Sequence, residues 1–229
     1  MDVNACLLAM QEIYRRDPQV AVRGQSFIKT LHSLIAADLR ARLTPEAVRQ
    51  GIEVREEVTV YGSHKPKDVD VGVIDPSNGP LVLVGVRSQM SSIGKNALTY
   101  YEGIVGECIS IQDRFPMAVT GYVYLHPMRP IKEGKQQERV DHIRFARMYE
   151  AITGRSGLDY KSIRGVYDQF AYMVVDFDSS PPVLNRELVR TAVPDTDLDI
   201  ETFVGRLVST FKKRHLFLNV FNDSFPVRS

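Results

Sequence analysis

The chain contains no tryptophan and only two cysteines among its 229 residues. Cys6 and Cys108 both lie in apolar, helix-like stretches, which favours buried free thiols over a disulfide and fits a reducing compartment. No apolar run approaches the roughly 20 residues of a membrane helix. The N-terminal stretch has an acid before its apolar run and no cleavage-site pattern. We therefore expect a cytoplasmic protein with no membrane partner.

The chain also lacks an excess of charge of either sign. Lys and Arg number 29 against 28 Asp and Glu, a net charge of +1, so any nucleic-acid binding must come from local basic clusters. The motifs GxGxxG, GxxxxGK[ST] and GxSxG are absent, which argues against nucleotide-binding and serine-hydrolase functions. The five histidines show no metal-ligand spacing among themselves or with the cysteines, which argues against a zinc site.

Hydrophobic periodicity predicts helices first and strands second. Helical spacing predicts helices over residues 3–15 and 25–43, and Thr44-Pro45-Glu46 begins a short helix that ends at Gly51. Alternating or continuous apolar patterns then predict strands over 52–61, 69–74 and 81–86. A helix over 95–112 and a strand over 118–125 follow.

The remaining residues predict a C-terminal elaboration. It comprises a charged helix at about 136–152, a strand at 171–177, a proline-marked loop at 179–182 and a closing helix at about 199–214, which Asp197 or Asp199 would cap. A helix that crosses from an antiparallel hairpin to a further strand produces a mixed sheet. We therefore expect an α/β (α+β) fold with a mixed four- to five-stranded sheet flanked by helices. We also expect a single domain over 1–229, with its core at about 21–126 and the elaboration at about 127–229.

One segment, residues 68–95, contains the main candidate catalytic residues. Asp70 enters the second predicted strand, and the third strand ends at Arg87 in a short polar patch. Carboxylates and a cation at one end of a hairpin are what a Mg²⁺-dependent phosphodiesterase needs. A purely structural role stays open for both residues, because Asp70 alternates with valines and Arg87 could pair with an acid on an adjacent strand.

The order helix–strand–strand–strand–helix–strand over residues 21–126, with Asp70 in the second strand, resembles the PD-(D/E)xK nuclease superfamily, to which type II restriction endonucleases belong. The segment Val86-Arg87-Ser88-Gln89, followed by Ser91-Ser92 and Lys95-Asn96, is similar to the corresponding stretch of restriction enzymes. The resemblance implies a restriction-endonuclease-like core and an Mg²⁺-dependent DNA endonuclease. It also implies a homodimer on double-stranded DNA, because two strands must be cut.

In that family the first Asp and the (D/E) residue bind Mg²⁺, the middle residue offers its carbonyl, and the Lys positions or deprotonates the attacking water. By this resemblance the first Asp falls on Asp70 and the triplet on Gly85-Val86-Arg87. Val86 retains its carbonyl, but Gly85 supplies no carboxylate. Arg87 can stabilise an anionic transition state, although a pKa above about 12 makes it a poor general base.

Some members of the family take the missing carboxylate from the following helix. On a helical wheel with Leu98 at zero, Glu102 lies about 40° away, at the edge of the apolar arc, and Glu107 lies on the opposite flank, where we expect it to be solvated. We therefore predict catalytic roles for Asp70, Arg87 and Glu102 and a metal site of Asp70, Val86 and Glu102. Glu57 in the first strand is the alternative acid.

Candidate DNA contacts come from two segments. Polar residues after the third strand either face the phosphate and bases or cap the next helix, a role suited to Ser92 or Asn96. Residues 128–155 hold seven basic residues against four acidic ones, which fits a DNA-backbone surface or a solvated helix equally. The predicted DNA-binding residues are Ser88, Gln89, Ser91, Lys95, Arg139, Arg144 and Arg147.

Two other functions stay open. The absent acid at Gly85 and the arginine in place of lysine suit a nuclease-fold DNA-binding protein that has lost catalysis. The near-zero net charge suits a protein-interaction domain without nucleic acid. Metal-dependent cutting would exclude the first, and DNA binding with a steep salt dependence would exclude the second.

Overall fold

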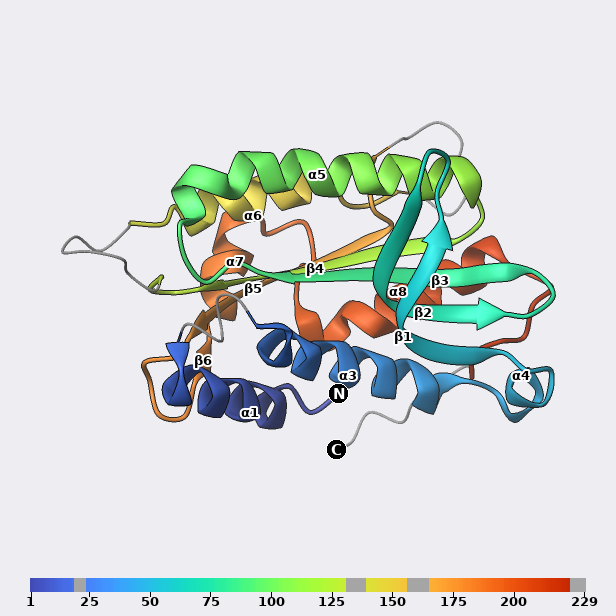
Figure 1. The fold of residues 1–229 in the computed structure, drawn as a ribbon, viewed down its shortest axis with the longest axis horizontal. Helices are drawn as coiled ribbons and strands as arrows, with labels where there is room; N and C mark the ends of the chain where they lie inside the picture. Colours follow the sequence, from blue (N-terminus) through green and yellow to red (C-terminus); the bar gives the residue numbers. More distant parts are fainter. Residues whose placement is uncertain (19–23, 131–138, 156–164, 223–229) are drawn as a thin grey trace.

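The computed structural model describes residues 1–18, 24–130, 139–155 and 165–222 (Figure 1). Its helices are α1 (Val3–Arg16), α3 (Gln25–Arg42), α4 (Pro45–Arg49), α5 (Ile93–Arg114), α6 (His142–Glu150), α7 (Arg186–Ala192) and α8 (Ile200–Arg214). Its strands are β1 (Glu53–Tyr61), β2 (Pro66–Asp75), β3 (Gly79–Ser88), β4 (Val119–Pro127), β5 (Gln169–Asp176) and β6 (Val183–Leu184). None of the described helices is long and apolar enough to span a membrane.

The strands form one mixed sheet in the spatial order β1-β2-β3-β4-β5-β6. β1, β2 and β3 are an antiparallel meander, β4 and β5 run parallel to β3, and β6 pairs antiparallel with β5. The parallel step from β3 to β4 is a crossover made by α5, as parallel strands require. The predicted mixed sheet with flanking helices is confirmed. The predicted strand number is wrong, because the described residues form six strands rather than four or five.

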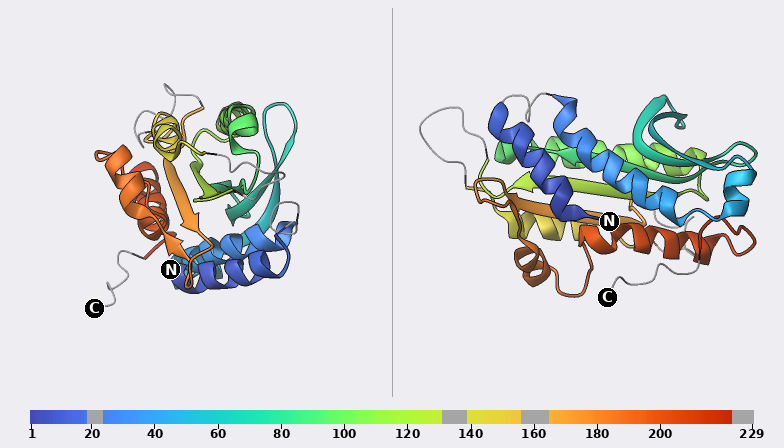
Figure 2. Two further views of the ribbon diagram at one scale, coloured as in Figure 1. Left: turned by 90° about the vertical axis from the view of Figure 1, so that its left-hand side faces the viewer. Right: turned by 90° about the horizontal axis from the view of Figure 1, so that it is seen from below.

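Helices cover both faces of this sheet. α5 and α6 lie side by side on one face, and α1 and α3 lie on the other (Figure 2). One apolar cluster joins α1, α3 and α8 to the sheet, and a second joins α5, α6 and α7 to the aromatic side chains of β4 and β5. Every residue of β4 is buried, as expected for a central strand with both faces covered.

Most predicted elements are found with shifted ends, and the differences have local causes. β6 and α7 were not predicted, since two and seven residues are too few for a clear period. Ser92 precedes α5 with a φ of 52° and makes no side-chain cap, so the alternative in which Ser92 caps this helix is not found. Asp199 does cap α8, accepting from the Glu201 N–H. Both cysteines are buried and unpaired, as predicted.

An ion pair inside the molecule joins α8 to the sheet. Asp168, fully buried before β5, binds the guanidinium of Arg214 at the end of α8, and Nη1 lies 3.0 Å from Oδ2. Asp168 also accepts the N–H of Thr120 at 2.7 Å, and Arg214 donates to the carbonyl of Ala118 at 2.9 Å. The pair therefore fixes the start of β4 against the start of β5 and the end of α8.

Replacing one partner of this ion pair tests how much the pair contributes to the stability of the fold. We expect Asp168→Asn to lower the free energy of unfolding by about 3–5 kcal/mol, because it leaves the Arg214 charge buried without a counter-ion. Urea unfolding measures the loss. Arg49→Gln is the control, since it breaks the exposed Arg49–Glu46 pair and should cost less than about 1 kcal/mol. Equal losses in the two variants would contradict the role assigned to Asp168.

Candidate active site

The site begins where β2 and β3 part. Their ladder runs only as far as Val71 and Val84, so Asp70 is the next residue of β2 beyond it. Oδ2 of Asp70 accepts the N–H of Val86 at 2.6 Å, so a side chain replaces a ladder bond at this point. In a strand the N–H and C=O of one residue face the same neighbour, so the Val86 carbonyl also faces this fork. We call the space around Asp70 and Val86 the strand fork.

Glu57 stands across from Asp70 on β1. The register pairs Glu56 with Val71 and Val58 with Val69, which puts Glu57 opposite Asp70 although the two are not paired. Glu57 has a φ of 56°, a left-handed conformation that costs a residue with a side chain about 1–2 kcal/mol. Its carboxylate lies 2.8 Å from the Lys29 ammonium. Backbone strain of this kind concentrates at functional sites.

His32 of α3 approaches Asp70 from the other side. Its Nε2 lies 3.6 Å from Oδ1 of Asp70, which is too long for a hydrogen bond. The residue is only 4% exposed, and neither ring nitrogen has a hydrogen-bond partner among the described residues. Burial lowers the pKa of His32 although Asp70 opposes this, and burial raises the pKa of Asp70 although His32 opposes it. His32 was not among the predicted site residues, and its only signal in the sequence is its place beside an apolar stripe.

Arg87, on β3, is a half-buried cation surrounded by tyrosines. Its guanidinium carbon lies 4.7 Å from the centre of the Tyr100 ring on α5, a cation–π contact. Burial disfavours the charged form, but Tyr122 and Tyr124 outweigh it and raise the pKa of Arg87. No carboxylate of the described residues forms an ion pair with Arg87. Its neighbours are tyrosine side chains, so within the described residues no ion pair neutralises its charge, which can attract an anion.

Glu107, rather than Glu102, lies near the buried side of α5. Glu102 is exposed, whereas Glu107 is partly buried, and burial raises its pKa with a further contribution from Asp70. The buried face of α5 is centred near Ile104, and at 100° per residue Glu107 lies about 60° from it and Glu102 about 160°. The helical-wheel expectation that Glu107 is solvated is wrong. The wheel included Leu98 in the apolar arc, but Leu98 is 52% exposed.

Tyr122 fills the place next to Gly85. The two residues are partners in the parallel ladder between β3 and β4. A Cβ at Gly85 would lie 2.6 Å from Cδ2 of the Tyr122 ring, closer than van der Waals contact permits. A longer acidic side chain therefore has no room here while Tyr122 is present. The sequence showed that the acid is missing, and the structure shows what occupies its space.

The predicted DNA contacts divide into two groups. Gln89 is buried, and its amide already binds the carbonyl of Ser92 and the hydroxyl of Tyr124, so it is not free for DNA in this structure. Ser88 and Ser91 are half-buried. The exposed residues are Lys95 on α5, Arg139, and Arg144 and Arg147 on α6. The other basic residues expected in 131–138 lie outside the described residues.

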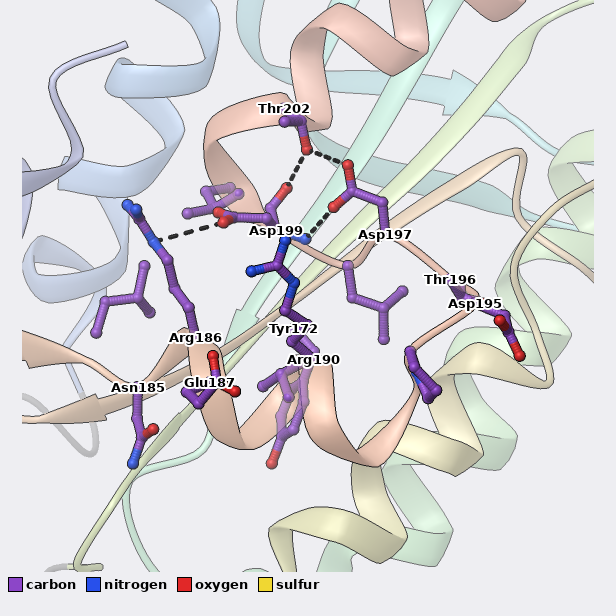
Figure 3. Close-up of a pocket in the computed structure, with 15 residues that line it drawn as sticks. Tyr172, Asn185, Arg186, Glu187, Arg190, Asp195, Thr196, Asp197, Asp199 and Thr202 are labelled. Atoms are coloured by element: carbon purple, nitrogen blue, oxygen red, sulfur yellow. Dashed lines mark hydrogen bonds and ion pairs between the residues drawn. The ribbon is translucent and has the colours of Figure 1, made fainter.

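A larger hollow of about 550 Å³ lies between α7 and the start of α8 (Figure 3). Arg186 and Asp199 form an ion pair across it, and Asp197 accepts a hydrogen bond from Thr202. These carboxylates serve the first turn of α8, since Asp197 and Asp199 accept the N–H groups of Asp199 and Glu201. The strand fork opens into a separate cavity of about 330 Å³, lined by Gln25, Glu57, Asp68, Val69 and Asp70.

Within the described residues, no group of three or more His, Cys, Asp or Glu side chains converges as a ready metal site. The comparisons with known proteins add no assignment, since the chain matches no family model, no curated protein and no solved structure.

The contact between Gly85 and Tyr122 leads to a stability prediction. We expect Gly85→Ala to lower the free energy of unfolding by about 1–3 kcal/mol, because the added methyl group overpacks against the ring. Combining it with Tyr122→Leu should cost less than the sum of the single changes, measured by urea unfolding. Gly103→Ala is the control, because no atom lies within 4 Å of its Cβ position, and it should stabilise α5 by about 0.5–1 kcal/mol. A neutral Gly85→Ala would contradict the steric account.

The buried acid on α5 gives a pH prediction. The pKa of Glu107 is raised above its usual 4.5, so the folded state holds the proton more tightly than the unfolded state and loses stability as pH rises above that value. Glu107→Gln should therefore be more stable than the parent chain at pH 7, and the difference should shrink as pH falls towards 4.5. Thermal unfolding from pH 4 to pH 8 measures it. Glu102→Gln is the matched control, and the same trend in both variants would contradict the placement of Glu107.

Proposed function

We propose that this chain is a divalent-cation-dependent DNA endonuclease of the restriction type, which hydrolyses phosphodiester bonds at the strand fork. The observation that supports this is the electrostatic grouping of Asp70 with His32, Arg87 and Glu107, in which burial lowers the pKa of His32 and raises those of Asp70 and Glu107. Such groupings are typical of active sites. An antiparallel hairpin followed by a helix and a parallel strand also agrees with the resemblance to PD-(D/E)xK nucleases.

The donor atoms at the fork suit Mg²⁺. The Asp70 carboxylate, the Val86 carbonyl and the nearby Glu57 offer hard oxygen ligands. The pKa of Asp70 is raised because burial outweighs the stabilisation that His32, the Val86 N–H and Arg87 give its ionised form, and a bound cation would stabilise that form further. Mg²⁺ held there would neutralise the phosphate and lower the pKa of the attacking water.

The side chains around the cation position have distinct roles in this proposal. Arg87, stacked on Tyr100, would hold the scissile phosphate with planar, fixed donors and stabilise the charge that develops on it. Glu107, with a raised pKa, would take a proton from water near neutral pH. Lys95, Arg144 and Arg147 would contact the DNA backbone. Two chains would act together as a homodimer to cut both strands.

A second candidate function is DNA binding without cleavage. The observation that favours it is the Tyr122 ring beside Gly85, which leaves no room for a second acid on β3. Arg87 and the basic side chains of α6 would still bind phosphates in that case.

A cleavage assay separates the two functions. We expect the purified chain to cut mixed plasmid and phage DNA into discrete bands with Mg²⁺ or Mn²⁺ and not with EDTA. Asp70→Asn should reduce the rate at least about 100-fold, and Glu107→Gln should reduce it much more than the matched Glu102→Gln. Intact DNA with retarded mobility in a gel shift would favour the second candidate. Intact DNA without a shift would contradict both and favour a protein-interaction role.

A further inference from the structure

The buried imidazole of His32 makes no hydrogen bond within the part of the chain that the structure describes. Buried polar side chains are nearly always hydrogen-bonded, and an unpaired one is a cost that an apolar residue at the same place would avoid. His32 is 4% exposed, neither ring nitrogen has a hydrogen-bond partner among the described residues, and Nε2 faces Asp70. The neighbouring positions of α3, such as Leu31 and Ile35, are apolar and fully buried. A polar residue retained here points to a ligand at the fork.

The geometry between His32 and Asp70 fits a shared ion. Two ligand atoms about 2.1 Å from one octahedral ion and at right angles to each other lie about 3 Å apart. Nε2 and Oδ1 are 3.6 Å apart, so a small rotation of either side chain brings both to one ion. Oδ2 of Asp70 is already held by the Val86 N–H, which leaves Oδ1 for the ion. The adjoining cavity of about 330 Å³ admits the ion and its waters.

We infer that the strand fork binds one divalent cation between Nε2 of His32 and Oδ1 of Asp70, and that this nitrogen ligand makes the site select Mn²⁺ over Mg²⁺. Mg²⁺ prefers an all-oxygen shell, whereas Mn²⁺, which also favours oxygen ligands, belongs to the first-row transition series and accepts an imidazole nitrogen more readily than Mg²⁺ does. Glu57 completes the set when its carboxylate leaves Lys29, because it stands opposite Asp70 on β1. The inference rests on the proposed function in taking the Asp70 site as the place of the cation, and it names the cation.

Electron paramagnetic resonance on the purified chain without DNA tests this inference. We expect one bound Mn²⁺ per chain, and displacement by Mg²⁺ only at a concentration at least about tenfold higher. Pulsed spectra of the bound Mn²⁺ should show coupling to an imidazole nitrogen. His32→Asn should remove this coupling and weaken Mn²⁺ binding at least about tenfold, with a smaller effect on Mg²⁺. His64→Asn, which replaces an exposed histidine, should change neither.

Several results would overturn the inference. They are no Mn²⁺ binding at millimolar concentration, bound Mn²⁺ without nitrogen coupling, or equal competition by Mg²⁺. The nitrogen coupling is measured on the parent chain, so it shows whether a histidine binds the Mn²⁺ even if the His32→Asn variant does not fold. Nitrogen-coupled Mn²⁺ in a chain that leaves DNA intact would contradict the proposed function alone. DNA cleavage by a chain whose Mn²⁺ shows no coupling would contradict this inference alone.

Discussion

β2 and β3 share a ladder for only part of their length, and the polar space of the candidate site exists because they separate beyond Val71 and Val84. A buried backbone donor needs a partner wherever a ladder stops. Asp70 provides that partner for Val86, and the bond holds the carboxylate at the fork. A carboxylate held in this way, with its pKa raised by burial, is already oriented for a cation before any ligand arrives. The hydrogen bond between Asp70 and Val86 therefore completes the sheet and also orients the carboxylate for the proposed cation.

The surroundings of Arg87 depend on the register between β3 and β4. In this parallel pair Gly85 stands beside Tyr122 and Arg87 beside Tyr124, and the buried Asp168–Arg214 pair fixes the start of β4. A slip of one residue would move the tyrosines to the other face of the sheet. In this register the Tyr122 ring occupies the space that an acidic side chain at position 85 would need, so the two positions depend on each other.

The parts of the fold that were predictable are those with a clear hydrophobic period. The strands around Asp70 and the helix that becomes α5 followed from alternation and helical spacing. Asp70 was singled out as the acid that enters the second strand, with Arg87 at the end of the third. Glu102 stays a prediction, and its exposure was not foreseen because a wheel shows which residues share a face but not which face meets the sheet. Leu98 is exposed at one side of α5, and Ile104 is buried at another. The meeting of Gly85 with Tyr122, or of His32 with Asp70, depends on tertiary packing between distant segments, which no local pattern encodes.

The missing acid at position 85 weakens the proposed binding of the cation but favours the proposed binding of a phosphate by Arg87. A carboxylate on residue 85 would lie two residues from Arg87 on the same side of β3 and would compete for its charge. Without it, the cation loses one ligand, but Arg87 keeps its full charge for a phosphate. DNA binding at this face is therefore expected under both candidate functions. The two candidate functions differ in whether the site binds a catalytic cation. That depends on whether Asp70, His32 and Glu57 hold the cation firmly enough without an acid at position 85, where the Tyr122 ring leaves no room for one.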